Sequence, residues 1–203
     1  LSDTLSLHDA LPISNAAAKQ GMPPVGPTAA RLLILGSLPG DESIRQQQYY
    51  AHPQNQFWRM LCAVFDEPIC ASYAERLNLL NRHRIAVWDA AHSASRRGSL
   101  DSAITAPIAN DFASFFESHI HIEAIAFNGQ KAAALFKSCV EPTAKEHAAA
   151  WPTATLPSTS PAAARLTFDD KVAKWRAFLL AHTPTVSHAA HPTAKRSGST
   201  YRP

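Results

Sequence analysis

Residues 30–36 read Ala-Arg-Leu-Leu-Ile-Leu-Gly, and this stretch decides the fold class of the chain. A short, continuous apolar run that ends in glycine is typical of a parallel strand buried on both faces. Three more runs favour strands, at 85–89, 122–127 and 153–156. Because stretches with helical spacing separate these runs, strands and helices alternate along the chain. The alternation predicts an α/β fold, a three-layer α/β/α sandwich around a short, mostly parallel four-stranded sheet.

The expected helices are marked by apolar residues three and four positions apart and by residues that favour helix ends. Pro53 suits a first helical turn, so we expect a helix from Pro53 to Phe65. Asn110 is a suitable N-cap for a helix over 111–118. The other expected helices cover residues 71–83, 130–138 and 168–182.

Residues 22–182 are expected to form one folded domain between two segments of different character. Thr4 to Ile13 resembles the translation of a sequencing-adapter oligonucleotide, so residues 1–21 are expected to be a non-native or disordered leader, with Met22 as the true start. Residues 183–203 are rich in Pro, Ser, Thr, Ala and His, which predicts a disordered tail. This tail holds three of the positive charges behind the net charge of +3, so the global charge does not argue for a nucleic-acid partner.

Composition excludes several classes of protein. A length of 203 residues suits one domain of ordinary size. The mean hydropathy is −0.16 and no run of eighteen apolar residues occurs, which excludes a membrane-spanning helix. Three cysteines without a C-x-x-C pair exclude a disulfide scaffold and a zinc or iron–sulfur site. We therefore expect a cytoplasmic protein with no metal.

The residues that follow the expected strands are small or polar. Ligands of parallel sheets bind beyond the carboxyl ends of the strands, so these residues are expected to meet in one site at one edge. Neither the G-x-S-x-G pattern of a nucleophile elbow nor a phosphate-binding P-loop is present among them. The segments are Gly36-Ser37-Leu38-Pro39-Gly40, Asp89, Asn128-Gly129 and Leu156-Pro157-Ser158-Thr159-Ser160-Pro161.

The first of these segments continues into a longer pattern. Together with Gln47-Gln48-Tyr49-Tyr50-Ala51-His52-Pro53-Gln54-Asn55-Gln56-Phe57-Trp58, it resembles the first motif of the uracil-DNA glycosylase superfamily, in its hypoxanthine-DNA (deoxyinosine) glycosylase branch. Residues 156–161 resemble the second motif of that branch. Ser99-Leu100-Asp101-Ser102-Ala103-Ile104 and Phe127-Asn128-Gly129 match its intervening segments, so the resemblance covers residues 31–182.

The resemblance implies an enzyme that initiates base excision repair. Such an enzyme extrudes a deaminated base, hypoxanthine first and uracil second, from single- or double-stranded DNA and hydrolyses its N-glycosidic bond. The resemblance further implies a monomer without a cofactor that associates with a nucleoid of bacterial type in the cytoplasm. No lysine lies in the motif loops, so a monofunctional hydrolase that leaves an abasic site is expected rather than a Schiff-base lyase.

Two residues are candidates for positioning the attacking water. The resemblance carries the essential role over to Asn55, whose amide oxygen can hold a water without being a base; the alternative is an asparagine that only satisfies the start of a helix. Ser37 stands where related families place an Asp or Asn, and a serine is too weak a base to replace them unaided. A purely structural serine in a tight turn remains equally open.

Six residues are candidates for holding the flipped base. Tyr50 is expected to stack on the base, unless it is a core aromatic. Gly36, Pro39 and Gly40 are expected to let the backbone approach the base or the deoxyribose; with only seven glycines in the chain, each is expected where a Cβ would not fit. Asp89 can accept a hydrogen bond from hypoxanthine N1–H, whereas adenine presents a bare acceptor; the alternative is a cap for the next helix.

Asn128 completes this set. Its side chain can donate to O6 of the base, although Asn-Gly after a strand is first of all a turn signal.

Contacts to the DNA backbone are expected from two loops. Ser158, Thr159 and Ser160 offer hydroxyl and amide groups to phosphates, and Arg96-Arg97 form a local basic loop. Leu156 stands where uracil-specific relatives have a histidine that helps the leaving base, which leaves His52 as a weakly supported substitute. Arg165 reads better as a solvated surface charge.

Three other functions remain open on the sequence alone. The substitutions represented by Ser37 and Leu156 are compatible with a catalytically silent nucleic-acid-binding relative. A uracil-selective glycosylase and a hydrolase of free nucleosides are the others, and they differ from the first hypothesis in base preference and in dependence on DNA.

Overall fold

The computed structural model describes residues 18–140 and 151–184, so the adapter-like stretch and nearly all of the expected tail lie outside the described residues. The elements in chain order are β1 (Ala18–Gln20), β2 (Leu32–Gly36), α1 (Asp41–Gln46), α2 (Phe57–Val64), α3 (Tyr73–Arg82), β3 (Ile85–Asp89), β4 (Ala91–Ser95), η1 (Asp101–Ala103), β5 (Thr105–Ala109), α4 (Phe112–Ser118), β6 (Ala124–Asn128), α5 (Gln130–Leu135), η2 (Phe136–Val140), β7 (Thr153–Leu156) and α7 (Phe168–His182). None of the helices in these ranges is long and apolar enough to cross a membrane.

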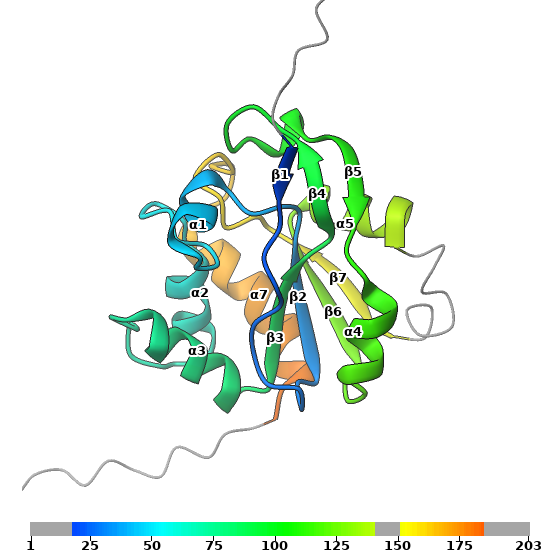
Figure 1. Cartoon of the computed structure of the whole chain (residues 1–203). Helices are drawn as coiled ribbons and strands as arrows, with labels where there is room; N and C mark the ends of the chain where they lie inside the picture. The colour runs from blue at the N-terminus through cyan, green and yellow to red at the C-terminus, as the bar shows by residue number, and fades with distance from the viewer. Residues whose placement is uncertain (1–17, 141–150, 185–203) are drawn as a thin grey trace, which may run out of the picture.

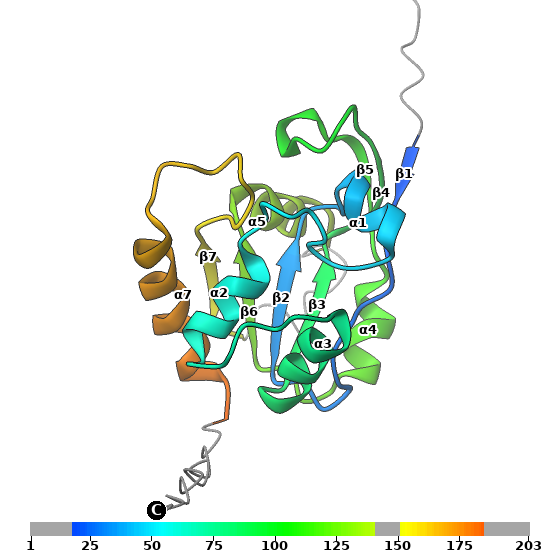
Figure 2. The ribbon, with the colours of Figure 1, turned by 90° about the vertical axis from the view of Figure 1, so that its left-hand side faces the viewer.

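Four parallel strands form the central sheet, in the order β3-β2-β6-β7. Helices α2, α3 and α7 cover one face of this sheet, and α4 and α5 lie on the other (Figures 1 and 2). The predicted α/β/α sandwich around a four-stranded sheet is therefore confirmed. The chain leaves β2 toward β3 on one side and later returns to β6 on the other, which makes the carboxyl end of β2 a topological switch point.

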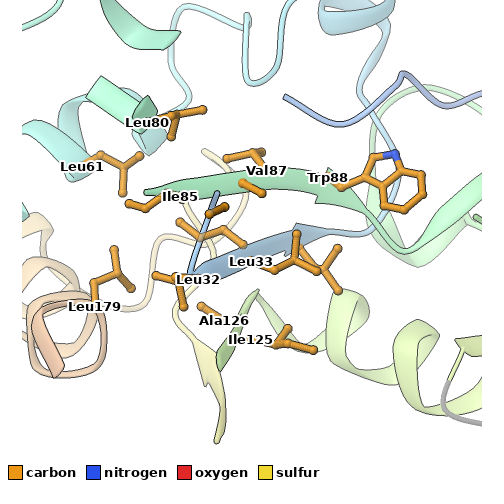
Figure 3. Packing of buried hydrophobic residues seen from close by; sticks show 14 of the residues in the cluster. Leu32, Leu33, Leu61, Leu80, Ile85, Val87, Trp88, Ile125, Ala126 and Leu179 are labelled. Carbon is orange, nitrogen blue, oxygen red and sulfur yellow. The ribbon is translucent and has the colours of Figure 1, made fainter. Parts of the chain in front are cut away.

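The core lies on both faces of this sheet. Every residue of β2, β3 and β6 is buried, which explains why these strands read as continuous apolar runs rather than as alternating ones. Figure 3 shows Leu61, Leu80 and Leu179, from α2, α3 and α7, on one side of the sheet, while Leu33 and Ile125 point to the opposite side. Truncating such a side chain to alanine costs about 2–5 kcal/mol, so the sheet is a rigid base for whatever its loops carry.

A second sheet, which we did not expect, contains the antiparallel strands β1, β4 and β5. Its strands are rich in Ala and Ser and include Pro107, residue types that are depleted in strands, and the β4–β5 register is irregular. Ala18 of β1 pairs with Ser95 of β4. The folded part therefore begins before Met22, the residue at which the folded domain was expected to start.

Several expected element boundaries are wrong. Pro53 lies in a turn, and α2 begins only at Phe57. The N-cap of α4 is Asp111, whose carboxylate accepts from the amide of Ser114 at 3.1 Å, whereas Asn110 donates to the carbonyl of Asp89 at 2.7 Å.

Two further elements differ from the expectation. The helix expected over 130–138 is split into α5 and a π-helical turn, η2. The six-residue helix α1 was missed because its residues are mostly polar and show no apolar spacing.

The segment before β2 is tied to the sheet edge and to the loop after α1. Val25 exchanges backbone hydrogen bonds of 2.9 and 2.8 Å with Val87 and so covers the outer edge of β3. The carbonyl of Met22 accepts from Trp88 Nε1 at 3.0 Å and from the Tyr49 hydroxyl at 3.1 Å. These bonds fix the segment that carries the neighbouring aromatic residue, Tyr50.

Candidate active site

A cavity of about 250 Å³ opens at the carboxyl ends of the central strands. Figure 2 shows α1, the connection from β7 to α7 and the connection from β4 to β5 gathered at this end of the sheet. The site was expected at this edge, and most of the candidate residues meet there. The wall includes residues 36–40, Tyr49, Tyr50, His52, Asn55, Asp89, Arg96, residues 99–101, Asn128 and residues 158–162.

Gly36 and Asp89 face each other across β2 and β3, where they are register partners. A Cβ on Gly36 would lie 2.2 Å from Asp89 Oδ1 and 3.1 Å from the Tyr50 hydroxyl, so only glycine fits here. The expectation that a Cβ would not fit is wrong for Gly40, where the nearest atom is at an ordinary 3.4 Å.

The Asp89 carboxyl is almost fully buried, with 3% of the residue exposed. Burial, and to a smaller extent the nearby charge of Asp101, raise the pKa of Asp89 to about 7, although the charge of Arg96 acts in the opposite direction. Within the described part of the chain, Asp89 Oδ2 has no hydrogen-bond partner, and the Tyr50 hydroxyl makes none of ordinary geometry, although Asn128 lies near enough to lower the pKa of Tyr50. Buried polar atoms are rarely left without partners, so these two atoms point to a polar ligand in the cavity.

Tyr50 lines the same cavity from the segment between α1 and α2. Its ring stacks on that of Phe57, with centroids 3.9 Å apart and an interplanar angle of 23°. Its φ of 54° lies in the left-handed region, a costly conformation for a bulky residue that is often found at functional sites. Burial and the charge of Asp89 raise the pKa of Tyr50 well above its usual range, so its hydroxyl stays protonated.

Ser37 leaves β2 at the switch point and is 7% exposed. Its hydroxyl donates to Asp101 Oδ1 at 2.6 Å. Asp101 belongs to η1, and it was not among the candidate site residues even though it lies in the segment 99–104 that matches the family. The sequence offers only a weak signal for it, an acidic residue within the segment 99–104 that matches the family, because its contact with Ser37 spans 64 positions.

Asn55 lies in the turn before α2, half-buried at the cavity wall. Its Oδ1 accepts a hydrogen bond from the backbone amide of Phe57 at 3.0 Å. Asn55 therefore does satisfy the start of α2, and this contact is compatible with a catalytic role as well. A carbonyl oxygen has two lone pairs, so the bond leaves one for a water molecule.

The family model of the uracil DNA glycosylase superfamily matches residues 23–182. The chain belongs to the uracil DNA glycosylase superfamily. Two curated relatives from Methanosarcina are both named hypoxanthine DNA glycosylase, which confirms the predicted resemblance to that branch. The one from M. barkeri is 41% identical over 114 residues, which cover 56% of this chain and 72% of the relative. The one from M. acetivorans is 44% identical over 115 residues, which cover 56% and 73%.

A solved structure agrees with this assignment. The solution NMR structure of a candidate uracil DNA glycosylase from M. acetivorans has a TM-score of 0.68 and 37% sequence identity. The match covers 80% of this chain and 97% of that one.

In this superfamily member, the second motif is held to the end of β6 by a clamp between two side chains. Asn128 Nδ2 donates to Thr159 Oγ1, and Asn128 Oδ1 accepts from the Thr159 amide, both at 2.9 Å. Thr159 is fully buried, so the prediction that its side chain contacts DNA is wrong. Ser158 and Ser160 are half-buried on the cavity wall and stay candidates.

Arg96 does not lie on the surface of this glycosylase-family fold either. It is 2% exposed and donates to the carbonyls of Leu38 and Pro39, so it holds the backbone of the first motif in place. Its predicted contact to DNA is therefore wrong, because the guanidinium faces inward. The neighbouring Arg97 is exposed and stays a candidate.

Three other candidates are placed as follows. Leu156 is buried at the end of β7. His52 is exposed at the cavity wall, where its Nδ1 accepts from the amide of Gln54 at 3.2 Å. Arg165 is exposed and lines a second hollow, together with Lys171, and not the cavity at the carboxyl ends of the central strands. Among residues 18–140 and 151–184, no cluster of three or more His, Cys, Asp or Glu side chains is placed to hold a metal ion.

Proposed function

We propose that this enzyme removes hypoxanthine from DNA and leaves an abasic site, as a DNA glycosylase without lyase activity. The observation that carries the proposal is the cavity at the end of β2, into which two buried polar groups, Asp89 Oδ2 and the Tyr50 hydroxyl, bring unused hydrogen-bonding capacity. The names of the Methanosarcina relatives support hypoxanthine as the base. Among the described residues no lysine lines the cavity. This supports attack by water rather than attack by a lysine amine, which would form a Schiff base.

Asp89 is proposed to read the edge of the flipped base. In its charged form the carboxylate accepts from N1–H of hypoxanthine but faces a bare acceptor at N1 of adenine. Guanine also carries N1–H, so its exclusion is assigned to the cost of extruding a base from a stable G·C pair. Uracil presents N3–H beside O4, and the same carboxylate would accept from it, which makes uracil the second substrate.

Tyr50 is proposed to stack on the base, supported from behind by Phe57. Base–aromatic stacking is worth about 1–3 kcal/mol, enough to offset part of the unstacking that extrusion requires. The backbone at Gly36, Pro39 and Gly40 would approach the base and deoxyribose, since Arg96 fixes the carbonyls of this loop.

Asn55 is proposed to hold the attacking water through the second lone pair of its Oδ1. Cleavage develops positive charge on the deoxyribose, and a water oriented beside C1′ captures it. Ser158, Ser160 and Arg97 would grip the flanking phosphates.

The test replaces Asn55 with alanine and measures single-turnover release of hypoxanthine from a deoxyinosine duplex. We expect the rate to fall by about 100-fold or more, with DNA affinity within threefold of wild type. The matched control is Asn78→Ala, since Asn78 is exposed on α3. An Asn55→Ala rate equal to that of wild type would remove Asn55 from the mechanism, and binding without excision by wild type would favour the silent-relative alternative.

A further inference from the structure

Ser37 and Asp101 lie 64 positions apart in the sequence, yet their side chains share a short hydrogen bond. The Ser37 hydroxyl donates to Asp101 Oδ1 at 2.6 Å, so its single hydrogen points at the carboxylate. A hydroxyl whose hydrogen is committed in this way keeps its lone pairs for accepting hydrogen bonds. Both residues line the base cavity, where an incoming water is the natural donor to Ser37.

The surroundings hold Asp101 in this position. Arg96 NH1 lies 4.0 Å from the same Oδ1, and its other bonds anchor it to the backbone of Leu38 and Pro39. The Asp101 side chain is 43% exposed, so it can exchange protons with solvent, whereas Asp89 is buried against Gly36. Two carboxyl groups in one cavity thus occupy different environments, an arrangement that separates their roles.

We propose that Asp101 is a positioning residue for the proposed glycosylase reaction: it orients the Ser37 hydroxyl toward the attacking water and receives the water proton through it. The inference rests on the proposed function. It adds a carboxylate that accepts the proton, because a serine hydroxyl alone is too weak a base to do so.

The step balances as follows. The water oxygen forms a bond to C1′ while the C1′–N bond breaks and its electron pair leaves with the base. One water proton passes to Ser37 Oγ as the Ser37 proton passes to Asp101. The departing base takes a proton from solvent, and Asp101 returns its own to solvent.

The test compares single-turnover excision from a deoxyinosine duplex by wild type, Ser37→Ala, Asp101→Asn and the double variant. We expect each single change to slow excision by about 100-fold, and the double change to slow it no further, because both residues act in one relay. DNA affinity is expected to stay within threefold of wild type. The control is Asp169→Asn, the same substitution at an exposed position in the first turn of α7.

Rescue by a conservative variant separates this role from a structural one. Asp101→Glu keeps a carboxylate that can accept from the Ser37 hydroxyl, so it is expected to recover part of the rate that Asp101→Asn loses. If Asp101→Asn does not fold, Ser37→Ala takes its place as the reference, and Asp101→Glu is expected to excise faster than Ser37→Ala.

Excision by Asp101→Asn or Ser37→Ala near the wild-type rate, additive losses in the double variant, or no recovery of rate in Asp101→Glu would overturn the inference alone. Absence of excision by wild type would overturn the proposed function and the inference with it.

Discussion

At the scale of single residues, the proposed function gives Asp89 both the selectivity for the base and the pH dependence of that selectivity. Its neighbours are Gly36, Tyr50, Asp101 and Arg96, and burial raises the pKa of Asp89 to about 7. Below that pH the neutral carboxyl carries a hydrogen that it can donate to N1 of adenine. Above it, only bases with an N–H at that position are accepted. Under the proposed function, discrimination against adenine would therefore depend on ionisation of Asp89.

The first prediction concerns this ionisation. From pH 6 to pH 8 the charged fraction of a group with a pKa near 7 rises about tenfold, and we expect the preference for deoxyinosine over a mismatched deoxyadenosine to rise by a similar factor. Asp89→Asn, whose amide does not titrate, is expected to show no such change. The measurement is competitive binding of the two duplexes across this range. A preference of wild type that does not change with pH would contradict the assignment of Asp89.

At the scale of elements, the connection from β4 to β5 contributes the rim of the cavity. Leu100 in this connection is 59% exposed and lines the cavity. It directly precedes Asp101, which accepts the hydrogen bond from Ser37. Exposed apolar side chains at such a rim can enter the gap that a flipped base leaves in the stack. The gap exists in duplex DNA but not in a flexible single strand.

The second prediction follows from this difference. Leu100→Ala is expected to slow excision of hypoxanthine from a duplex by about tenfold, and to leave excision from a single strand within twofold, because only the duplex needs the gap filled. Ile120→Ala, at an exposed apolar residue outside the cavity, is the control. Equal losses on both substrates would show that Leu100 does not act as a wedge.

The third prediction concerns the clamp between β6 and the second motif. Asn128→Ala leaves the buried Thr159 amide and hydroxyl without their partner, and each unsatisfied group costs about 1–3 kcal/mol. We expect the free energy of unfolding in urea to fall by about 2–4 kcal/mol, against less than 0.5 kcal/mol for Asn78→Ala. A loss as small as that of the control would mean that the loop is held by other contacts, such as the bond from Trp175 Nε1 to the Pro157 carbonyl at 2.9 Å.

At the scale of the whole molecule, the segment before β2 joins the two sheets. β1 pairs with β4, and Lys19 donates to Asp41 and to the carbonyl of Gly98 at 2.6 Å, which links the start of α1 to the rim loop. A chain that begins at Met22 lacks these contacts.

The fourth prediction compares a chain that begins at residue 18 with one that begins at Met22. Loss of β1 and of Lys19 is expected to lower Tm by a few degrees, in line with about 1 kcal/mol for a domain of this size. Differential scanning calorimetry of the two chains measures this. An identical Tm would show that β1 adds no stability.

The central sheet and the site residues at its strand ends could be predicted from the sequence for one physical reason. Buried parallel strands carry continuous apolar runs, and their carboxyl ends meet at one edge, which brought Gly36, Asp89 and Asn128 together in advance. The antiparallel sheet was not predictable in this way, because its strands have weak propensity, β1 pairs with a strand distant in the sequence, and the β4–β5 register is irregular.

Contacts between residues distant in the sequence also explain which polar residues were misassigned or missed. Arg96, Thr159 and Asp101 owe their roles to hydrogen bonds with residues 31 to 64 positions away, which no local pattern encodes. An arginine pair in a loop and a threonine between prolines both read as surface features until the partners that bury them are known.

The most direct test of the central claim is strand cleavage after alkali, resolved on a gel, with duplexes that carry one deoxyinosine, one deoxyuridine or neither. We predict an alkali-dependent break at deoxyinosine, faster than at deoxyuridine, and none in the unmodified duplex. A folded protein that binds these duplexes and breaks none of them, or that hydrolyses free inosine instead, would contradict the account.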